Sequence, residues 1–173
     1  VLALEGAAAS LIAKDDVVLN LASGVYGKGF GYWAARYAKK VEEIEVAYDT
    51  AIDPEQVRAF LKDHPEVKVV CVCHHDTPSG TLNDIDAIGA VVAEAGALLL
   101  VDAVSSWGGM PTSPTASQAG IYVTGPNKCL GCPPSLSLVA VSEAAWAKIE
   151  SNPDAPFASM LSLKDWKNAW KKT

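Results

Sequence analysis

Six short runs rich in apolar residues recur along this chain of 173 residues, and polar or amphipathic segments separate them. The runs are residues 16–23, 41–48, 67–75, 97–104, 121–125 and 136–142. Short runs of this kind are typical of strands that are buried on both faces. Such strands occur in parallel sheets that helices cover on both sides. The recurrence of these runs therefore limits the fold more than any other feature of the sequence.

The segments between the runs carry helix signals. Residues 54–63 begin with Pro54 directly after Asp53, which is a favoured N-cap residue. Asn83 is expected to cap a second helix that ends near Gly96. Strands that alternate with helices predict βαβ units with right-handed crossovers. The predicted fold is therefore α/β, a three-layer α/β/α sandwich around a mostly parallel sheet.

Charge and patterning exclude several classes of partner. The formal net charge of −6 disfavours binding to a nucleic-acid backbone. No apolar run approaches the ~20 residues of a membrane span, and the opening residues lack the positive region of a signal peptide. We therefore expect a cytoplasmic protein that binds neither nucleic acid nor a membrane.

A metal site is not expected. The adjacent His74 and His75 would point to opposite faces of a strand end, so they cannot bind one ion together. The cysteines are expected to be reduced thiols, because the sequence shows no secretory pattern. They are Cys71, Cys73, Cys129 and Cys132.

Polar and reactive residues follow four of the predicted strands, at 23–26, 75–77, 102–104 and 124–128. Ligands bind outside the carboxyl ends of the strands in an open α/β sheet. An acid, a hydroxyl, an aromatic ring and an amine would meet at this edge. The sequence therefore predicts a binding site there.

Asp102 and Lys128 indicate a chemistry for this edge. Asp102 ends the most hydrophobic run, where a buried carboxylate needs a cationic partner, although a helix cap or a salt bridge would also explain it. Lys128 could reach the same crevice, or it could be a solvated loop lysine. The acid could keep a pyridine nitrogen protonated while the amine captures the aldehyde of pyridoxal as a Schiff base. Val104 shares a strand face with Asp102 and could pack under the ring. Tyr26, expected at the tip of the loop "SGVYG", could stack above it.

The stretches "HHDTPSGT", "LLLVDAVSSWGGM" and "VTGPNKCLGCPP" resemble the class V aminotransferase family of fold type I pyridoxal enzymes. The resemblance extends over essentially the whole chain. It implies that Lys128 is the Schiff-base lysine, Asp102 the partner of the pyridine nitrogen and Tyr26 the stacking aromatic residue. Thr77 would offer a hydroxyl near the polar edge of the ring. His75 and Asn127 complete the predicted cofactor-binding residues, beside Val104.

The resemblance implies an amino-group transfer between pyridoxamine and pyruvate, or another 2-oxo acid, that gives pyridoxal and L-alanine. Pro126 stands where most relatives carry the serine of an "SGSQK" stretch, so a phosphate would lose a donor. This difference favours unphosphorylated pyridoxal or pyridoxamine bound at Lys128 as a substrate. The alternatives are an alanine–glyoxylate or serine–pyruvate aminotransferase that uses pyridoxal 5'-phosphate, and, from another class, a non-catalytic α/β binding module.

A second difference from the family is "PPSL" in place of the usual "PPGL", so Ser135 would be strained if this position required a positive φ.

The chain is expected to be one part of a larger enzyme, because it opens in the middle of a helix. Residues 1–150 would form the central part of the pyridoxal-binding large domain, and residues 151–173 would begin the connection to a C-terminal domain. The resemblance implies that arginines of that domain bind the substrate carboxylate, and that the full-length enzyme is a homodimer or homotetramer. We therefore expect this chain alone to show weak or no turnover.

Overall fold

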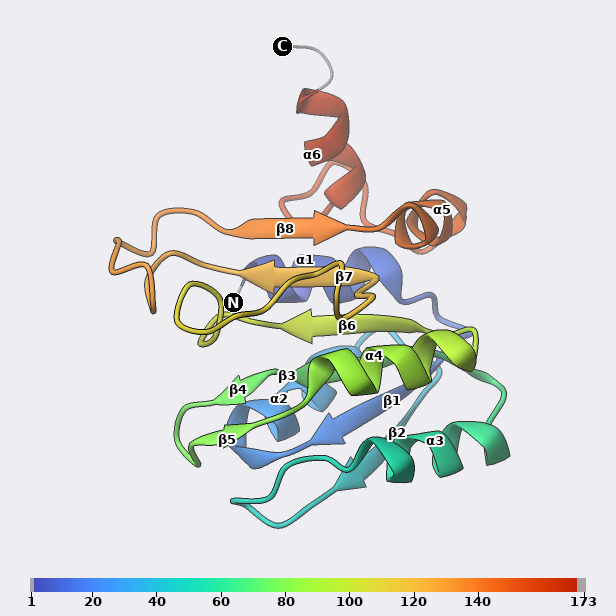
Figure 1. The fold of residues 1–173 in the computed structure, drawn as a ribbon. Coiled ribbons are helices and arrows are strands. Elements are labelled where there is room, and N and C mark those ends of the chain that lie inside the picture. The colour runs from blue at the N-terminus through green and yellow to red at the C-terminus, as the bar shows by residue number, and fades with distance from the viewer. Residues whose placement is uncertain (1, 171–173) are drawn as a thin grey trace.

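The fold is built around one six-stranded sheet, which lies in the middle of the molecule in Figure 1. The computed structural model describes residues 2–170. The strands of the sheet are β1 (Val17–Ala22), β2 (Lys40–Glu45), β3 (Val67–Cys73), β6 (Leu98–Asp102), β7 (Ile121–Thr124) and β8 (Leu138–Val141). Their order is β2-β1-β3-β6-β7-β8, and only β8 runs antiparallel to its neighbour. A hairpin of β4 (His75–Asp76) and β5 (Thr81–Leu82) follows β3.

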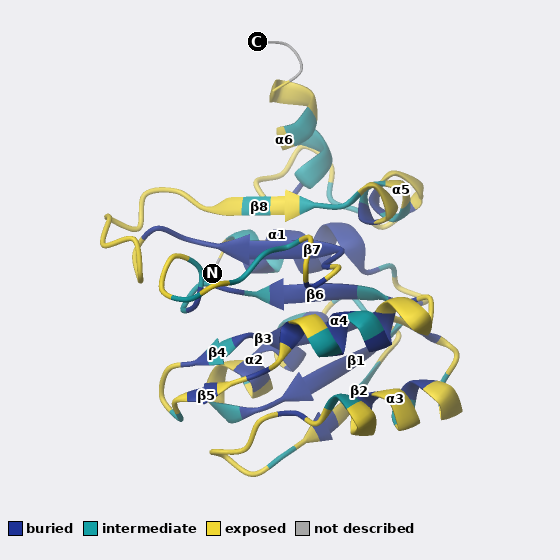
Figure 2. Cartoon of the chain, in the orientation of Figure 1, coloured by how far each residue is buried: buried dark blue, intermediate teal, exposed yellow. Residues whose placement is uncertain are grey.

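Helices cover both faces of this sheet. They are α1 (Leu2–Leu11), α2 (Gly24–Ala34), α3 (Pro54–Asp63), α4 (Ile85–Glu94), α5 (Glu143–Ser151) and α6 (Leu163–Trp170). One buried cluster joins α3 and α4 to the sheet, and another joins α1, α2 and α5 to it. Figure 2 shows the central strands buried and the outer sides of the helices exposed. The predicted three-layer α/β/α fold with a mostly parallel sheet is confirmed.

All six predicted strands are present, and the central four are the most buried. The run predicted over 67–75 is divided, because β3 ends at Cys73 and the chain turns at His74 into the hairpin. At one edge of the sheet, β2 carries a lysine and three glutamates among its six residues. Charges on an edge strand oppose pairing with another chain, which explains why this predicted strand is the least apolar one.

Of the two N-cap residues predicted from the sequence, one is correct and one is wrong. Asp53 caps α3 as expected, since its Oδ1 accepts a hydrogen bond from the backbone N–H of Glu55 at 2.9 Å. Asn83 does not cap α4, because Asp84 does so by accepting from the N–H of Ala87. Asn83 is instead buried, and its amide joins the end of β3 to the segment before α3. In residues 2–170, no helix combines the length and apolarity that a membrane crossing requires.

The segment that follows α5 packs against α1. The Ser10 hydroxyl donates to the carbonyl oxygen of Leu161 at 3.0 Å and accepts from the N–H of Leu163 at 3.1 Å. The Asn152 amide donates to the carbonyl oxygens of Ser10 and Ile12. The predicted division at residue 150 therefore falls where the chain is bonded to its first helix, and that division stays a prediction.

Gly89→Ala is expected to destabilise the protein, because the added methyl group would lie 1.8 Å from the backbone oxygen of Ser117. Overpacking of this kind costs about 1–3 kcal/mol. Gly29 is the matched control, since it also lies within a helix but has nothing within 4 Å of its would-be Cβ. Gly29→Ala should stabilise the protein by about 0.5–1 kcal/mol through helix propensity. Urea unfolding measures both effects, and equal effects would contradict the close packing of α4.

Candidate active site

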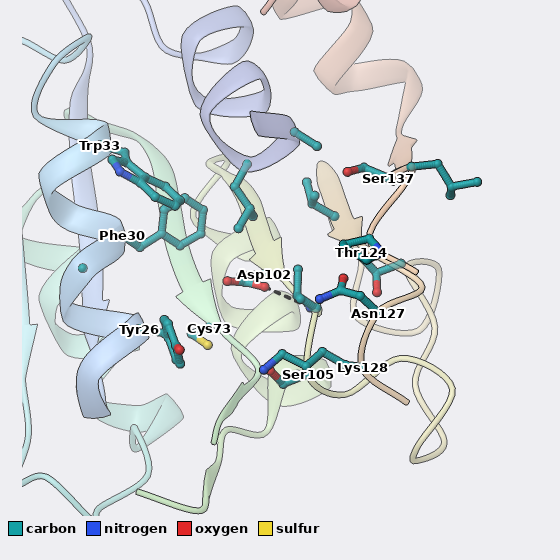
Figure 3. Close-up of a pocket in the computed structure, with 18 of the residues that line it drawn as sticks. Tyr26, Phe30, Trp33, Cys73, Asp102, Ser105, Thr124, Asn127, Lys128 and Ser137 are labelled. Atoms are coloured by element: carbon teal, nitrogen blue, oxygen red, sulfur yellow. Dashed lines mark hydrogen bonds between the residues drawn. The ribbon is translucent and has the colours of Figure 1, made fainter. Parts of the chain in front are cut away.

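A cavity of about 600 Å³ opens beside α2, at the carboxyl ends of β6 and β7. Small-molecule sites commonly have volumes of about 300–1,000 Å³. Five of the seven residues proposed from the sequence line it. They are Tyr26, Asp102, Val104, Asn127 and Lys128. Figure 3 shows Tyr26 on α2, Asp102 at the end of β6, and Asn127 and Lys128 on the loop after β7, so the structure brings the acid and the amine to one cavity.

Asp102 is the last residue of β6, and its carboxylate faces the cavity. Its Oδ1 accepts a hydrogen bond from the backbone N–H of Val104 at 2.9 Å. Burial raises the pKa of Asp102 above its ordinary value, while the N–H of Val104 and the charge of Lys128 act in the opposite direction. Within residues 2–170, no lysine, arginine or histidine forms an ion pair with this carboxylate. A cationic ligand group would therefore find a half-buried acid that lacks an ion-pair partner among these residues.

Lys128 lies on the loop that joins β7 to β8, and it is exposed while also lining the cavity. Two backbone hydrogen bonds fold this loop, from Cys132 N–H to the oxygen of Pro126 at 2.9 Å and from Gly131 N–H to the oxygen of Lys128 at 3.0 Å. Ser135 is not strained, since Gln118 and Ala158 are the non-glycine residues of the described chain with positive φ. The loop therefore holds the amine at the open side of the cavity.

Tyr26 lies in the first turn of α2 rather than at the tip of a loop. The helix can start here because Gly24 adopts a φ of +70°, which glycine takes without strain. A Cβ at Gly24 would also lie 2.2 Å from the carboxylate of Asp76, so the two segments approach closely. The ring of Tyr26 is 49% exposed and lines the cavity, where a planar ligand could stack on it.

Asp76 fixes the start of α2, a role that the sequence reasoning missed. Its buried carboxylate accepts from the backbone N–H of Tyr26 at 2.7 Å and from the Ser79 hydroxyl and N–H at 2.7 and 3.1 Å. Burial raises the pKa of Asp76, but these hydrogen bonds outweigh it and hold the pKa below its ordinary value. A carboxylate at a helix N-terminus is also favoured by the helix dipole. The available signal was the acid of "HHDTPSG", which stands three residues before a serine.

The structure does not place His75 and Thr77 in the wall of the cavity. Thr77 is exposed in the turn between β4 and β5. His75 is half-buried, and its Nδ1 lies 3.2 Å from the backbone oxygen of Ser105. Both residues are close in sequence to Asp76, so they belong to the segment that supports α2 rather than to the lining residues.

An aromatic wall on α2 was also missed. Phe30 and Trp33 line the cavity beside Tyr26, and their rings make an edge-to-face contact with centroids 6.1 Å apart. The spacing of Tyr26, Phe30 and Trp33 is i, i+4, i+7, which places three rings on one helix face. This spacing could have identified the wall, once residues 24–34 were recognised as a helix.

The four cysteines are free thiols, as expected. Burial raises the pKa of Cys71 to about 12. Cys73 is buried at the end of β3 and lines the cavity, and its pKa is raised by burial and by the nearby charges of Asp102 and Asp76. Cys129 and Cys132 are exposed. No group of three or more histidine, cysteine or acidic residues that could hold a metal occurs among the described residues.

The residues present fit a pyridoxal ring. The Asp102 carboxylate can hold a protonated ring nitrogen, the Lys128 amine can reach an aldehyde, and the ring of Tyr26 can cover one face. The fit rests mainly on Asp102, because this half-buried carboxylate has no ion-pair partner in the part of the chain that the structure describes, and a cation in the cavity would favour its charged form.

Comparison with known proteins agrees with this arrangement. Residues 9–161 match the family model described as "Aminotransferase class-V". The match covers most of the chain, so the chain belongs to the class V aminotransferase family.

The similar proteins within this family include transaminases of two kinds. The chain is 68% identical over 172 residues to a pyridoxamine–pyruvate transaminase of Mesorhizobium japonicum, and the match covers 99% of this chain and 44% of that protein. The crystal structure of pyridoxamine–pyruvate aminotransferase from Mesorhizobium loti matches with a TM-score of 0.95 at 69% identity, covering 98% of this chain and 43% of the other. That of an alanine–glyoxylate aminotransferase from Nostoc sp. matches with a TM-score of 0.91 at 28% identity, covering 97% and 44%. The chain thus spans less than half the length of these relatives.

Asp76→Asn is expected to destabilise the protein by about 2 kcal/mol at neutral pH, because hydrogen bonds to a buried carboxylate are lost or weakened. The pKa of Asp76 is lowered in the folded protein, so its contribution is present above the ordinary aspartate range and is lost as the pH falls through the lowered pKa. The difference between the variant and the original protein should therefore shrink on acidification. Urea unfolding at a series of pH values measures this change.

Asp84→Asn is the matched control, since Asp84 also accepts a backbone N–H at a helix start but is exposed. Asparagine is as good an N-cap as aspartate, so this variant should change stability by less than about 0.5 kcal/mol. A loss of stability at Asp76 that is independent of pH would refute the role given to its charge.

Proposed function

We propose that this chain forms the ring-binding site of a transaminase that transfers an amino group between pyridoxamine and pyruvate, giving pyridoxal and L-alanine. The observation that carries the proposal is that the Asp102 carboxylate, which has no ion-pair partner within residues 2–170, and the amine of Lys128 line one cavity. The Mesorhizobium relatives named for this reaction share about two thirds of their residues with this chain over the matched region, which supports the choice of substrates.

Each lining residue has a proposed part in the reaction. A bound pyridoxal ring supplies an electron sink for the carbon that gains or loses the amino group. Asp102 keeps the proton on the ring nitrogen, and Tyr26 and Val104 pack against the ring. The Lys128 amine would condense with the aldehyde carbon, with release of water, and would otherwise take up and return protons as a general base and acid. Asn127, next to Lys128 on the same loop, is proposed to contact the bound molecule.

The vitamin B6 form is proposed to be unphosphorylated and bound at Lys128 as a substrate. Pro126 is buried before Lys128 and offers no hydroxyl or N–H to a phosphate. The alternative is a resident pyridoxal 5'-phosphate, as in an alanine–glyoxylate type aminotransferase, and the similarity to the Nostoc enzyme supports it. The two forms differ in the mass of the adduct that they leave on the lysine.

Binding of the substrate carboxylate requires a cationic side chain, and neither arginine of this chain lines the cavity. Both arginines of the chain lie at the surface, where Arg36 pairs with Glu5 at 2.9 Å and Arg58 pairs with Glu55 and Glu94. We propose that arginines of a C-terminal domain bind the carboxylate, so that this chain alone has weak or no turnover.

The organisation of the whole enzyme is part of the same proposal. Residues 1–150 would be the central part of the large domain, and residues 151–173 would begin the connection to the C-terminal domain. The complete enzyme would be a cytoplasmic homodimer or homotetramer. The share of the relatives that the chain covers, 43–44%, supports the larger size.

Lys128→Ala is expected to abolish covalent capture of pyridoxal, because Lys128 is the lysine amine that lines the cavity in the described chain. The chain is mixed with pyridoxal, reduced with borohydride and weighed by mass spectrometry, with peptide mapping of the modified lysine. Lys62→Ala, a change at an exposed lysine of α3, is the control and should leave the adduct unchanged.

The same experiment with pyridoxal 5'-phosphate separates the two forms of the proposal. Preferential capture of pyridoxal supports the unphosphorylated substrate, and preferential capture of the phosphate ester supports the alternative. An equal adduct on the Lys128→Ala protein would favour a non-catalytic binding module and would refute the proposed function.

Asp102→Asn is expected to weaken pyridoxal binding by about ten- to a hundredfold at neutral pH, because a charge-assisted hydrogen bond to the ring nitrogen is lost. Since burial raises the pKa of Asp102, binding to the original protein should weaken as the pH falls through this raised pKa and the carboxylate is protonated. The ratio of the pyridoxal affinity of the original protein to that of Asp102→Asn should therefore approach one at low pH. Absorbance titration at a series of pH values measures it.

The stability of the unliganded protein should depend on pH in the opposite sense to pyridoxal binding. A carboxyl whose folded pKa is raised loses stability as the pH rises through that pKa, because its charged form is disfavoured in the folded state. Asp102→Asn should thus be as stable as the original protein or more stable at neutral pH. A variant with both weaker binding and lower stability would show that Asp102 has a structural rather than a ligand-binding role.

A further inference from the structure

Two adjacent histidines after β3 hold the same turn of the chain, residues 103–106. The structure places neither His74 nor His75 in the wall of the cavity. His74 binds a side chain of the turn and His75 binds its backbone. The backbone N–H of His74 also donates to the carbonyl oxygen of Asp102 at 2.9 Å, so the histidine pair lies directly beside the end of β6.

The contact made by His74 is buried and polar. Its Nδ1 lies 2.8 Å from the hydroxyl of Ser106, and both residues are buried. The Ser106 hydroxyl donates to the carbonyl oxygen of Ala103 at 3.3 Å, which leaves its oxygen free to accept a hydrogen bond from Nδ1–H of His74. The Ser106 hydroxyl also forms a hydrogen bond with the Tyr122 hydroxyl. The Tyr122 hydroxyl in turn lies 3.0 Å from the hydroxyl of Thr112. Breaking the contact with His74 would leave a buried polar group without its partner.

Burial keeps His74 in its neutral form. It lowers the pKa of His74, and the neighbouring His75 acts in the same direction, while Asp86 and Asp84 oppose the shift. A neutral imidazole has one N–H donor and one acceptor, so the hydrogen bond to Ser106 fixes which nitrogen carries the proton.

The contact made by His75 holds the next residue of the turn. Its Nδ1 lies 3.2 Å from the backbone oxygen of Ser105, and the same oxygen accepts from the thiol of Cys129 at 3.5 Å. Cys129 follows Lys128 in the chain, so this oxygen joins the turn to the loop that carries the amine. Ser105 and Lys128 both line the cavity shown in Figure 3.

Residues 103–106 help to fix the position of the Asp102 carboxylate. Its Val104 N–H donates the hydrogen bond that the Asp102 carboxylate accepts, which is the dashed line in Figure 3. Ala103 attaches the start of the turn to β7 through its N–H and carbonyl oxygen. The histidines hold the other end, at Ser105 and Ser106.

We propose that His74 and His75 are positioning residues, which clamp residues 103–106 so that the Val104 N–H stays on the Asp102 carboxylate and Val104 and Ser105 stay in the cavity wall. The effect on ligand binding rests on the proposed function. The clamp on Val104 is a property of the unliganded chain, and it can be tested separately.

The first test measures amide hydrogen exchange of Val104 in the unliganded chain by NMR, and pyridoxal affinity by absorbance titration. His74→Leu and Ser106→Ala each remove the buried hydrogen bond, so Val104 exchange should become about tenfold faster and affinity about tenfold weaker. His75→Leu removes a half-buried contact, so its effects should be smaller, about threefold. The double variant His74→Leu/Ser106→Ala should be no worse than the more impaired single variant, because the two residues share one interaction.

A conservative variant separates positioning from bulk packing. The side-chain amide nitrogen of asparagine can lie near the position of Nδ1, so His74→Asn should keep exchange and affinity within about threefold of the original values. Asn152→Ala is the control for general destabilisation, because Asn152 forms buried hydrogen bonds to Ser10 and Ile12 on the α1 side. It should lower the unfolding free energy and leave Val104 exchange and affinity unchanged.

Several results would overturn the proposal. One is a folded His74→Leu or Ser106→Ala protein with the original Val104 exchange and affinity, and another is a His74→Asn protein as impaired as His74→Leu. If His74→Leu does not fold, the smaller change Ser106→Ala decides. If the original chain binds no pyridoxal, the proposed function fails, but Val104 exchange in the same variants still decides whether the histidines clamp the turn.

Discussion

The partial burial of one carboxylate, Asp102, at the end of a hydrophobic strand is the constraint on which the site depends. The strand places the acid at the edge of a dry sheet, where its charged form is disfavoured and one backbone N–H supplies the hydrogen bond that it accepts. The rest of the cavity is arranged around this acid. The turn that follows it provides the N–H, the loop after β7 provides an amine, and α2 provides aromatic rings.

Two aspartates near the same sheet edge, the buried Asp76 and the half-buried Asp102, have pKa values shifted in opposite directions. Asp76 accepts several hydrogen bonds, which favour its charged form, whereas Asp102 accepts one and is dominated by burial. The first acid is thus satisfied within the protein and holds a helix. The second is left partly unsatisfied, as is typical of residues that bind a ligand. The two carboxylates thus differ in the number of hydrogen-bond donors around them and not in residue type, and this difference explains their opposite pKa shifts.

The sequence predicted the layers of the fold well, because buried parallel strands are recognisable as apolar runs and because Asp53 with Pro54 marks a helix start. It misplaced the cap of α4 by one residue, since Asn83 and Asp84 are equally good caps and only the buried hydrogen bonds of Asn83 decide between them. It placed Tyr26 in a loop, because the positive φ of Gly24 and the contact with Asp76 are tertiary features. It could not show that His75 and Thr77 lie outside the cavity wall, because the edge of a strand is predictable while the turn that follows it is not, and their contact with a bound molecule stays a prediction.

The position of Cys73 has a consequence for chemical selectivity. An aldehyde that enters the cavity meets a thiol as well as an amine, and sulfur is the stronger nucleophile only as the thiolate. Burial and the negative charges of Asp102 and Asp76 keep this thiol protonated. Burial therefore disfavours the charged forms of both Asp102 and Cys73, and the protonated thiol is a weaker nucleophile toward a carbonyl group than its thiolate would be.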